Sequence, residues 1–201
     1  MSQRGHSSPR AKWRAPHGSR KERARILVVT EGLVTEPQYF KGLAKHFKAT
    51  GVRVCGLKVI GDGRGDPLKV VKRADLETNN GHLVGKRDGF DSVWCVVDVD
   101  THVSLGDAII EAKRRNYNIV VSNPCFEIWL VWHFGEHRAY LTSRHAEKIS
   151  EKHGILEKRL PYDFPYGDVT LAIERSQRIE TEIPSNPGST AWKLAKVISQ
   201  L

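Results

Sequence analysis

Three carboxylates come directly after apolar runs of the sequence, where their spacing suits the binding of a divalent cation. Glu31 follows the run 25–30, and Asp98 and Asp100 follow the run 92–97. Because side chains alternate along an extended strand, Asp98 and Asp100 point the same way. Two carboxylates at the end of an apolar strand repel each other and lose hydration unless a cation lies between them. Hard oxygen ligands favour Mg²⁺ or Mn²⁺ over Zn²⁺.

The elements that must position these side chains alternate between short β-rich runs and helical stretches. Apolar and β-branched runs predict strands at 25–30, 52–60, 92–97 and 117–121. Each strand precedes a helix start, and these are Thr35-Glu36-Pro37-Gln38, Asp66-Pro67, Ser104-x-x-Asp107 and Asn123-Pro124. The first and third are capping boxes with Thr35 and Ser104 as N-caps. The alternation predicts an α/β fold with a Rossmann-like, mostly parallel four-stranded sheet flanked by helices.

The chain divides into three segments by composition and pattern. Residues 1–24 form a basic tail that we expect to be disordered, and residues 25–137 form the α/β core. Residues 138–201 are predicted to be a helical extension packed on the core, with helices at 142–153, 168–182 and 189–201.

Sites in open parallel sheets lie beyond the carboxyl ends of the strands. We therefore expect Glu31, Asp98 and Asp100 to share one edge of the sheet. A lone Asp-x-Asp is weak evidence because acidic pairs are common at strand ends, and Glu31 in the same sheet strengthens the case. Glu36, five residues beyond Glu31, is a candidate for a second metal position. Its alternative role is a first-turn acid that complements the helix dipole.

Three further residues are possible members of the site. Glu127 falls in the first turn of the fourth helix, and His102 lies two residues after Asp100, close enough to reach a substrate phosphate. His133 is six residues from Glu127, so the two project about 120° apart on a helix and cannot both face one small site. A helix-dipole acid and a core histidine are the alternatives for Glu127 and His133.

Charge is distributed unevenly along the chain. Residues 1–25 contain eight Arg or Lys and one acid, so this segment supplies +7 of the formal net charge of +9. A basic arm binds nucleic-acid phosphates by releasing counterions, although a merely solubilising terminus has the same composition. The candidate nucleic-acid contacts are Arg10, Lys12, Arg14, Arg20, Lys21 and Arg23. The chain shows neither a signal-peptide pattern nor an apolar run of membrane-spanning length, so we expect a cytoplasmic protein without membrane contact.

Four motifs in order resemble those of the RloB-like (AbiLii-like) family, and the Glu-Gly and Asp-x-Asp motifs are similar to those of Toprim domains. The resemblance covers residues 25–201, and Thr30 is its one departure, at a position where we expect Cys or a small residue. The motifs are Val28-Val29-Thr30-Glu31-Gly32-x-x-Thr35-Glu36-Pro37-x-Tyr39-Phe40, Val97-Asp98-x-Asp100, Ser122-Asn123-Pro124-x-Phe126-Glu127-x-Trp129-Leu130-x-x-His133 and Asn186-Pro187-x-Ser189-Thr190.

This resemblance implies a Toprim-like fold and Mg²⁺-dependent nuclease chemistry on RNA or DNA, in bacterial anti-phage defence by abortive infection. It also implies an ATPase partner encoded nearby. By this comparison Asp98 and Asp100 hold the metal, and Glu31 is a second ligand or the general acid/base. Two alternatives stay open from the residues. One is a non-catalytic nucleic-acid-binding or sensor subunit, and the other is a Toprim-like enzyme that acts on small nucleotides.

Overall fold

The described residues form a five-stranded sheet with the order β2-β1-β3-β4-β5, in which β5 runs antiparallel to β4 and the other pairs are parallel. The computed structural model describes residues 24–49, 51–56, 66–86, 89–99 and 104–200. The strands are β1 (Ile26–Thr30), β2 (Val52–Gly56), β3 (Ser92–Asp98), β4 (Asn118–Asn123) and β5 (Gly188–Ser189). The α/β class and the parallel arrangement of the first four strands are confirmed.

The expectation of four strands is wrong, because β5 adds a short edge strand to β4. Ser122 pairs with Ser189 and Asn123 with Gly188, where the sequence predicted a turn and the start of a helix. The Ser122 and Ser189 hydroxyls are 2.9 Å apart, and the Val121 N–H donates to Thr190 Oγ1 at 2.9 Å. A strand of two residues has no alternation to detect, so side-chain hydrogen bonds rather than hydrophobic pattern define it.

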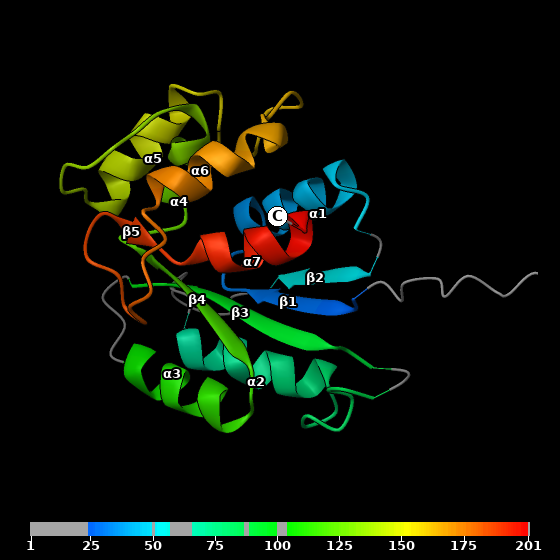
Figure 1. The fold of residues 1–201 in the computed structure, drawn as a ribbon. Coiled ribbons are helices and arrows are strands. Elements are labelled where there is room, and N and C mark those ends of the chain that lie inside the picture. Colours follow the sequence, from blue (N-terminus) through cyan, green and yellow to red (C-terminus); the bar gives the residue numbers. More distant parts are fainter. Residues whose placement is uncertain (1–23, 50, 57–65, 87–88, 100–103, 201) are drawn as a thin grey trace, which may run out of the picture.

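Helices cover both faces of the sheet (Figure 1). Helices α2 and α3 lie on one face, and α1 and α7 lie on the other, with α4, α5 and α6 gathered on the same side as α1. The helices are α1 (Thr35–His46), α2 (Pro67–Glu77), α3 (Leu105–Arg114), α4 (Glu127–Phe134), α5 (Ser143–Glu151), α6 (Val169–Arg175) and α7 (Ala191–Ser199), with a 3₁₀ turn at Tyr166–Asp168.

Strand β1 is buried on both faces, as its continuous apolar run predicted. Ile26 and Val28 contribute to the core beneath α1, α4 and α7, whereas Leu27 and Val29 contribute to the core beneath α2 and α3. Because neighbouring side chains on a strand point to opposite faces, a five-residue strand supplies both cores. This burial agrees with the position of β1 inside the sheet, between β2 and β3.

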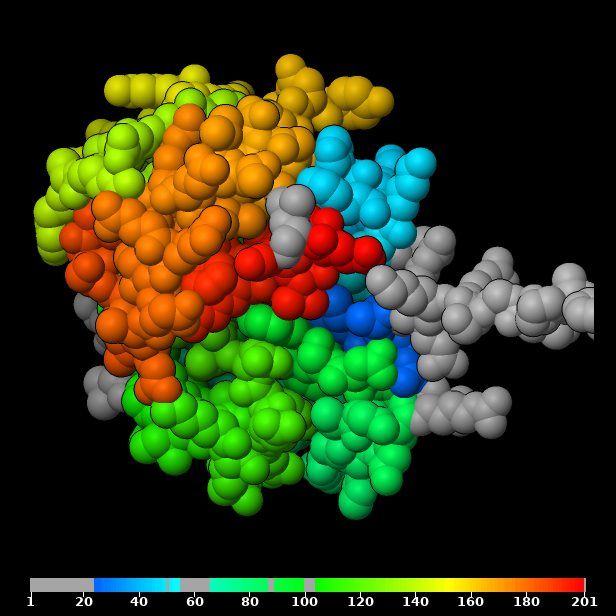
Figure 2. Space-filling view, in the orientation of Figure 1, coloured from blue at the N-terminus to red at the C-terminus, as the bar shows by residue number. Residues whose placement is uncertain are grey.

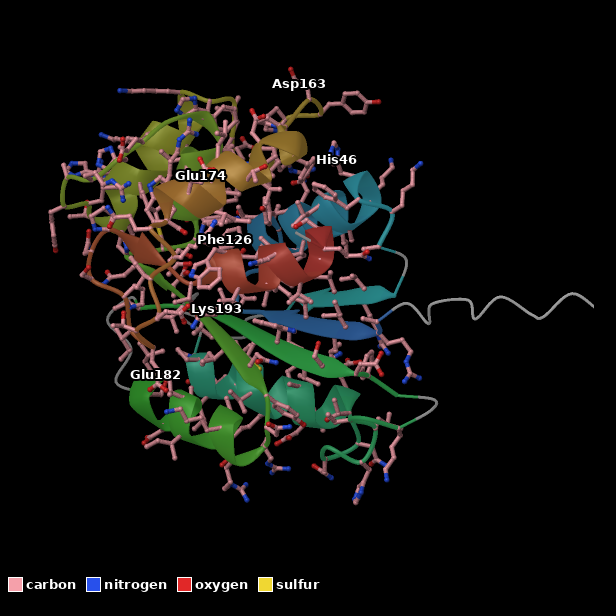
Figure 3. All side chains as sticks on the ribbon, viewed as in Figure 1. His46, Phe126, Asp163, Glu174, Glu182 and Lys193 are labelled. Atoms are coloured by element: carbon pink, nitrogen blue, oxygen red, sulfur yellow. The ribbon has the colours of Figure 1, made fainter. Side chains whose placement is uncertain are left out.

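The C-terminal segment shares the core of the sheet. Leu194 and Ile198 of α7 belong to the same buried cluster as Val28 of β1. Glu182 lies beside α3, where it forms an ion pair with Lys113 (Figure 3). In the space-filling view the red surface of α7 lies between the orange α6 region and the green surface below it (Figure 2). Residues after 138 therefore supply part of the layer that covers the sheet.

Both predicted capping boxes are wrong, because their side chains make tertiary contacts instead. Helix α1 begins at Thr35 itself, whose Oγ1 donates to the Lys158 carbonyl at 3.0 Å. Gln38 exchanges two hydrogen bonds with the Leu160 backbone, at 3.0 and 3.3 Å. Ser104 donates to Asp66 Oδ1 at 2.6 Å rather than capping α3. A capping pattern cannot reveal partners this distant in sequence.

Other element ends differ from the predictions by a few residues. Strand β4 continues two residues further than expected, to Asn123, and α4 begins at Glu127 rather than directly after Pro124. Helix α6 ends at Arg175, since Gln177 and Arg178 adopt left-handed φ values of 54° and 49°. No helix in the described part of the chain is long and apolar enough to cross a membrane.

Asn186 links the loop before β5 to the segment before α5 by side-chain hydrogen bonds. Its side chain accepts from the Leu141 N–H at 2.9 Å and donates to the Leu141 carbonyl at 2.7 Å. We expect Asn186→Ala to lower the free energy of unfolding by about 2 kcal/mol, because two partly buried hydrogen bonds are lost. Urea denaturation measures this change. The exposed neighbour Ser185 supplies the control, since Ser185→Ala should change stability by less than about 0.5 kcal/mol.

Candidate metal and active site

Glu31 joins the carboxyl ends of β1 and β3. Its N–H donates to the Val96 carbonyl at 3.0 Å, which extends the parallel ladder one residue beyond β1. Its Oε2 accepts the Asp98 N–H at 3.2 Å. Parallel pairing therefore brings two predicted site residues, 67 positions apart in sequence, into direct contact at the predicted edge of the sheet.

Glu36 is folded back over Gly32. Glu36 Oε1 accepts the Gly32 N–H at 3.1 Å, and a Cβ on Gly32 would lie 2.2 Å from Glu36 Oε2. A side chain at position 32 would therefore displace the Glu36 carboxylate from its present position. Glu36 is 7% exposed, and burial together with the charges of Glu127 and Glu31 raises its pKa to about 7.

Asp98 ends β3 with one carboxylate oxygen unpaired. The residue is half-buried, but its Oδ1 is sealed from solvent and has no hydrogen-bond partner among the described residues. Burial, followed by the charges of Glu36, Glu127 and Glu31, raises the pKa of Asp98 well above its usual range. The backbone of Phe126, the residue before α4, acts in the opposite direction and lowers this pKa.

Glu127 brings a fourth carboxylate to this cluster from the first residue of α4. It is 7% exposed and raises the pKa of both Glu36 and Asp98. It also lines a cavity of about 210 Å³ beside α5. The other lining residues are Glu147, Ser150, Glu151, Ile155, Glu157 and Lys158. We call Glu31, Glu36, Asp98 and Glu127 the carboxylate cluster.

Lys158 is a cation beside this cluster that the sequence did not reveal. Burial lowers the pKa of Lys158, but the charges of Glu127, Glu147, Glu36 and Asp98 raise it by more. Nothing near Lys158 in the sequence resembles a motif. Its position depends on contacts with residues more than 120 positions earlier, namely Thr35 and Gln38 of α1.

The cluster offers hard oxygen donors, which suit Mg²⁺ or Mn²⁺. No three acidic, imidazole or thiol groups within the described residues are positioned to coordinate one ion as they stand. Asp100 and His102 lie outside the described residues, so the Asp-x-Asp pair stays a prediction. The tail residues Arg10, Lys12, Arg14, Arg20, Lys21 and Arg23 also lie outside them.

His133 is placed within the aromatic core. Its Nδ1 lies 3.1 Å from the Pro165 carbonyl and its Nε2 lies 3.0 Å from the Tyr39 hydroxyl. A carbonyl accepts only, so Nδ1 donates and Nε2 accepts from Tyr39. Burial lowers the pKa of His133 to about 4. Both ring nitrogens have core partners, which matches the core alternative for His133 rather than a place beside Glu127.

The sequence was also compared with known protein families. The chain matches the family described as RloB-like protein over residues 26–198. It belongs to the RloB-like family. No significant match was found among curated proteins or among solved structures. The four sequence motifs of this RloB-like chain supply the carboxylate cluster and, through Asn186, Ser189 and Thr190, the strand pairing beside it.

The carboxylate cluster should make the metal-free protein less stable as pH rises. The pKa of Glu36 is about 7 when folded and 4.5 by its ordinary value, so the folded state binds more protons between these pH values. The stability contributed by protonated Glu36 is present below pH 4.5 and is lost as pH rises towards about 7. Glu36→Gln removes this loss and should stabilise the metal-free protein at pH 8 by about 1–3 kcal/mol.

Urea denaturation of wild type and of Glu36→Gln at pH 4 and pH 8 measures this effect. The quantity to compare is the difference in free energy of unfolding between the two proteins at each pH. His133 acts in the opposite direction, since its lowered pKa favours the folded state as pH rises, but it is present in both proteins and cancels. An equal stability gap between wild type and Glu36→Gln at the two pH values would contradict the prediction.

Proposed function

We propose that this protein is an Mg²⁺- or Mn²⁺-dependent nuclease with a Toprim-like site at the carboxyl ends of β1 and β3. The observation that carries the proposal is the carboxylate cluster, in which Asp98 Oδ1 is buried without a hydrogen-bond partner among the described residues. An unpaired buried carboxylate among three other acids is costly, and a bound cation offsets both burial and repulsion.

The donor set fits a hard divalent cation. The cluster offers carboxylate oxygens, and Asp100 follows Asp98 by two residues in the sequence, as an additional ligand requires. Asp98 and Asp100 would hold the ion, with Glu31 or Glu36 as further ligands. When bound, the ion draws a phosphate oxygen to itself and stabilises the charge that develops during attack on phosphorus.

The protein's own residues position this chemistry. Glu31 accepts the Asp98 N–H and so fixes the spacing between the ends of β1 and β3. The backbone of Phe126, just before α4, favours the ionised form of Asp98, as does the helix dipole at this end of α4. Gly32 keeps Glu36 turned inward. Glu31 would serve as a ligand or as the group that transfers a proton.

Membership of the RloB-like family supports a defence-associated role. We propose that the substrate is RNA or DNA, that a neighbouring ATPase controls its cleavage during phage infection, and that the protein acts in the cytoplasm. An activity that cleaves the cell's own nucleic acid must be restrained until infection. Control by a partner protein would supply that restraint.

Asp98→Asn and Glu31→Gln should each lower metal-dependent cleavage by about 100-fold or more, because a catalytic metal contributes several kcal/mol. The assay incubates purified protein with Mg²⁺ or Mn²⁺ against pooled tRNA, mRNA and plasmid DNA. Circular dichroism checks that each variant folds.

Asp163→Asn provides the matched control, because Asp163 is an exposed acid (Figure 3). It should cleave as wild type does. Mn²⁺ should raise the melting temperature of wild type and of Asp163→Asn but not of Asp98→Asn. Undiminished cleavage by folded Asp98→Asn would overturn the proposed function.

A further inference from the structure

A tight hairpin beside the carboxylate cluster holds two residues in a rare backbone conformation. Leu156 and Arg159 form an isolated antiparallel bridge, and the two residues between them, Glu157 and Lys158, have φ values of 49° and 63°. Turns of this kind favour Asn or Gly, because a Cβ is disfavoured at positive φ. Non-glycine residues keep such a conformation only where their surroundings fix it.

The surroundings that fix this hairpin are the first turn of α1. Thr35 Oγ1 donates to the Lys158 carbonyl at 3.0 Å, and Gln38 exchanges two hydrogen bonds with the Leu160 backbone. Glu36, a member of the carboxylate cluster, belongs to the same helical turn. The three hydrogen bonds therefore fix the position of Lys158 relative to the cluster.

The Lys158 side chain stands at the edge of the cavity that Glu127 lines. Among the described residues that line this cavity, Lys158 alone is cationic. Its Nζ lies 3.8 Å from Glu147 Oε1, which is too long for a hydrogen bond, and its side chain is 65% exposed. The ammonium group is thus held beside the acids while it stays accessible to an anion from solvent.

A phosphodiester that approaches four carboxylates meets repulsion that one cation does not remove completely. A second positive group at the cavity edge lowers that repulsion and orients the phosphate by a charge-assisted hydrogen bond. We propose that Lys158 binds a non-bridging oxygen of the scissile phosphodiester. This inference rests on the proposed nuclease function, and it assigns to the hairpin a direct role in substrate binding.

The competing explanation is that Lys158 only neutralises its acidic neighbours. In that case its removal would tighten the binding of a cation by the cluster and leave the substrate Michaelis constant unchanged. A phosphate contact predicts instead that the Michaelis constant rises, since loss of the ammonium weakens substrate binding, while cation binding stays equal or tightens through reduced repulsion.

The test uses bis(p-nitrophenyl) phosphate, a phosphodiester too small to span separate surface charges. With full-length protein and Mn²⁺, Lys158→Met should lower kcat/KM by about 10- to 100-fold, mainly by raising KM, because it removes a charge-assisted hydrogen bond. Lys158→Arg should stay within about threefold of wild type, since it restores a cationic donor. Lys148 is an exposed lysine of α5 outside the cavity lining, so Lys148→Met should leave kcat/KM at the wild-type value.

Calorimetric titration with Mn²⁺ accompanies each assay and separates the possible outcomes. Wild-type kcat/KM in Lys158→Met would overturn the inference and leave the nuclease proposal standing. So would a loss of activity matched by weaker Mn²⁺ binding, which indicates a structural role. Wild-type protein that fails to bind Mn²⁺ or to cleave the diester would overturn both. Lower kcat/KM with intact Mn²⁺ binding and rescue by Lys158→Arg supports the phosphate contact.

Discussion

Parallel pairing between β1 and β3 is the constraint on which the rest of the site depends. Thr30 lies opposite Val96 in this register, so Glu31 comes level with Val97, one residue before β3 ends at Asp98. The ladder then continues through the Glu31 N–H and the Glu31 carboxylate. A slip of one residue would move the Glu31 carboxylate away from the Asp98 N–H and break the contact between these two residues.

Segments that come much later in the sequence pack beside this edge of the sheet. Helix α4 contributes Glu127, and the backbone of Leu160, just after the hairpin, is hydrogen-bonded to Gln38 of α1. The asparagines of the Asn-Pro motifs serve the framework, since Asn123 donates to the Pro184 carbonyl and Asn186 pairs with Leu141. The sequence motifs therefore combine two kinds of residue, the acids of the cluster and the groups that fix their supports.

Local pattern was enough to predict the first four strands and the edge where Glu31 and Asp98 lie, because buried parallel strands are continuous apolar runs. It was not enough for β5, which has two residues and is defined by the hydroxyls of Ser189 and Thr190. The capping boxes predicted at Thr35 and Ser104 were wrong, although Ser104 does occupy the N-cap position of α3. Their partners, Lys158 and Asp66, lie far away in the sequence, and no local rule could supply them.

The hydrogen bonds from Thr35 and Gln38 to residues 158 and 160 have a consequence for the order in which the protein is made. Synthesis proceeds from the N-terminus, and early segments begin to fold before later ones appear. A chain still attached to the ribosome and shorter than 160 residues has the strands that carry Glu31 and Asp98 but lacks the hairpin that completes the cavity. The cavity beside the carboxylate cluster is thus completed only late in translation, after the strands that carry Glu31 and Asp98 have been made.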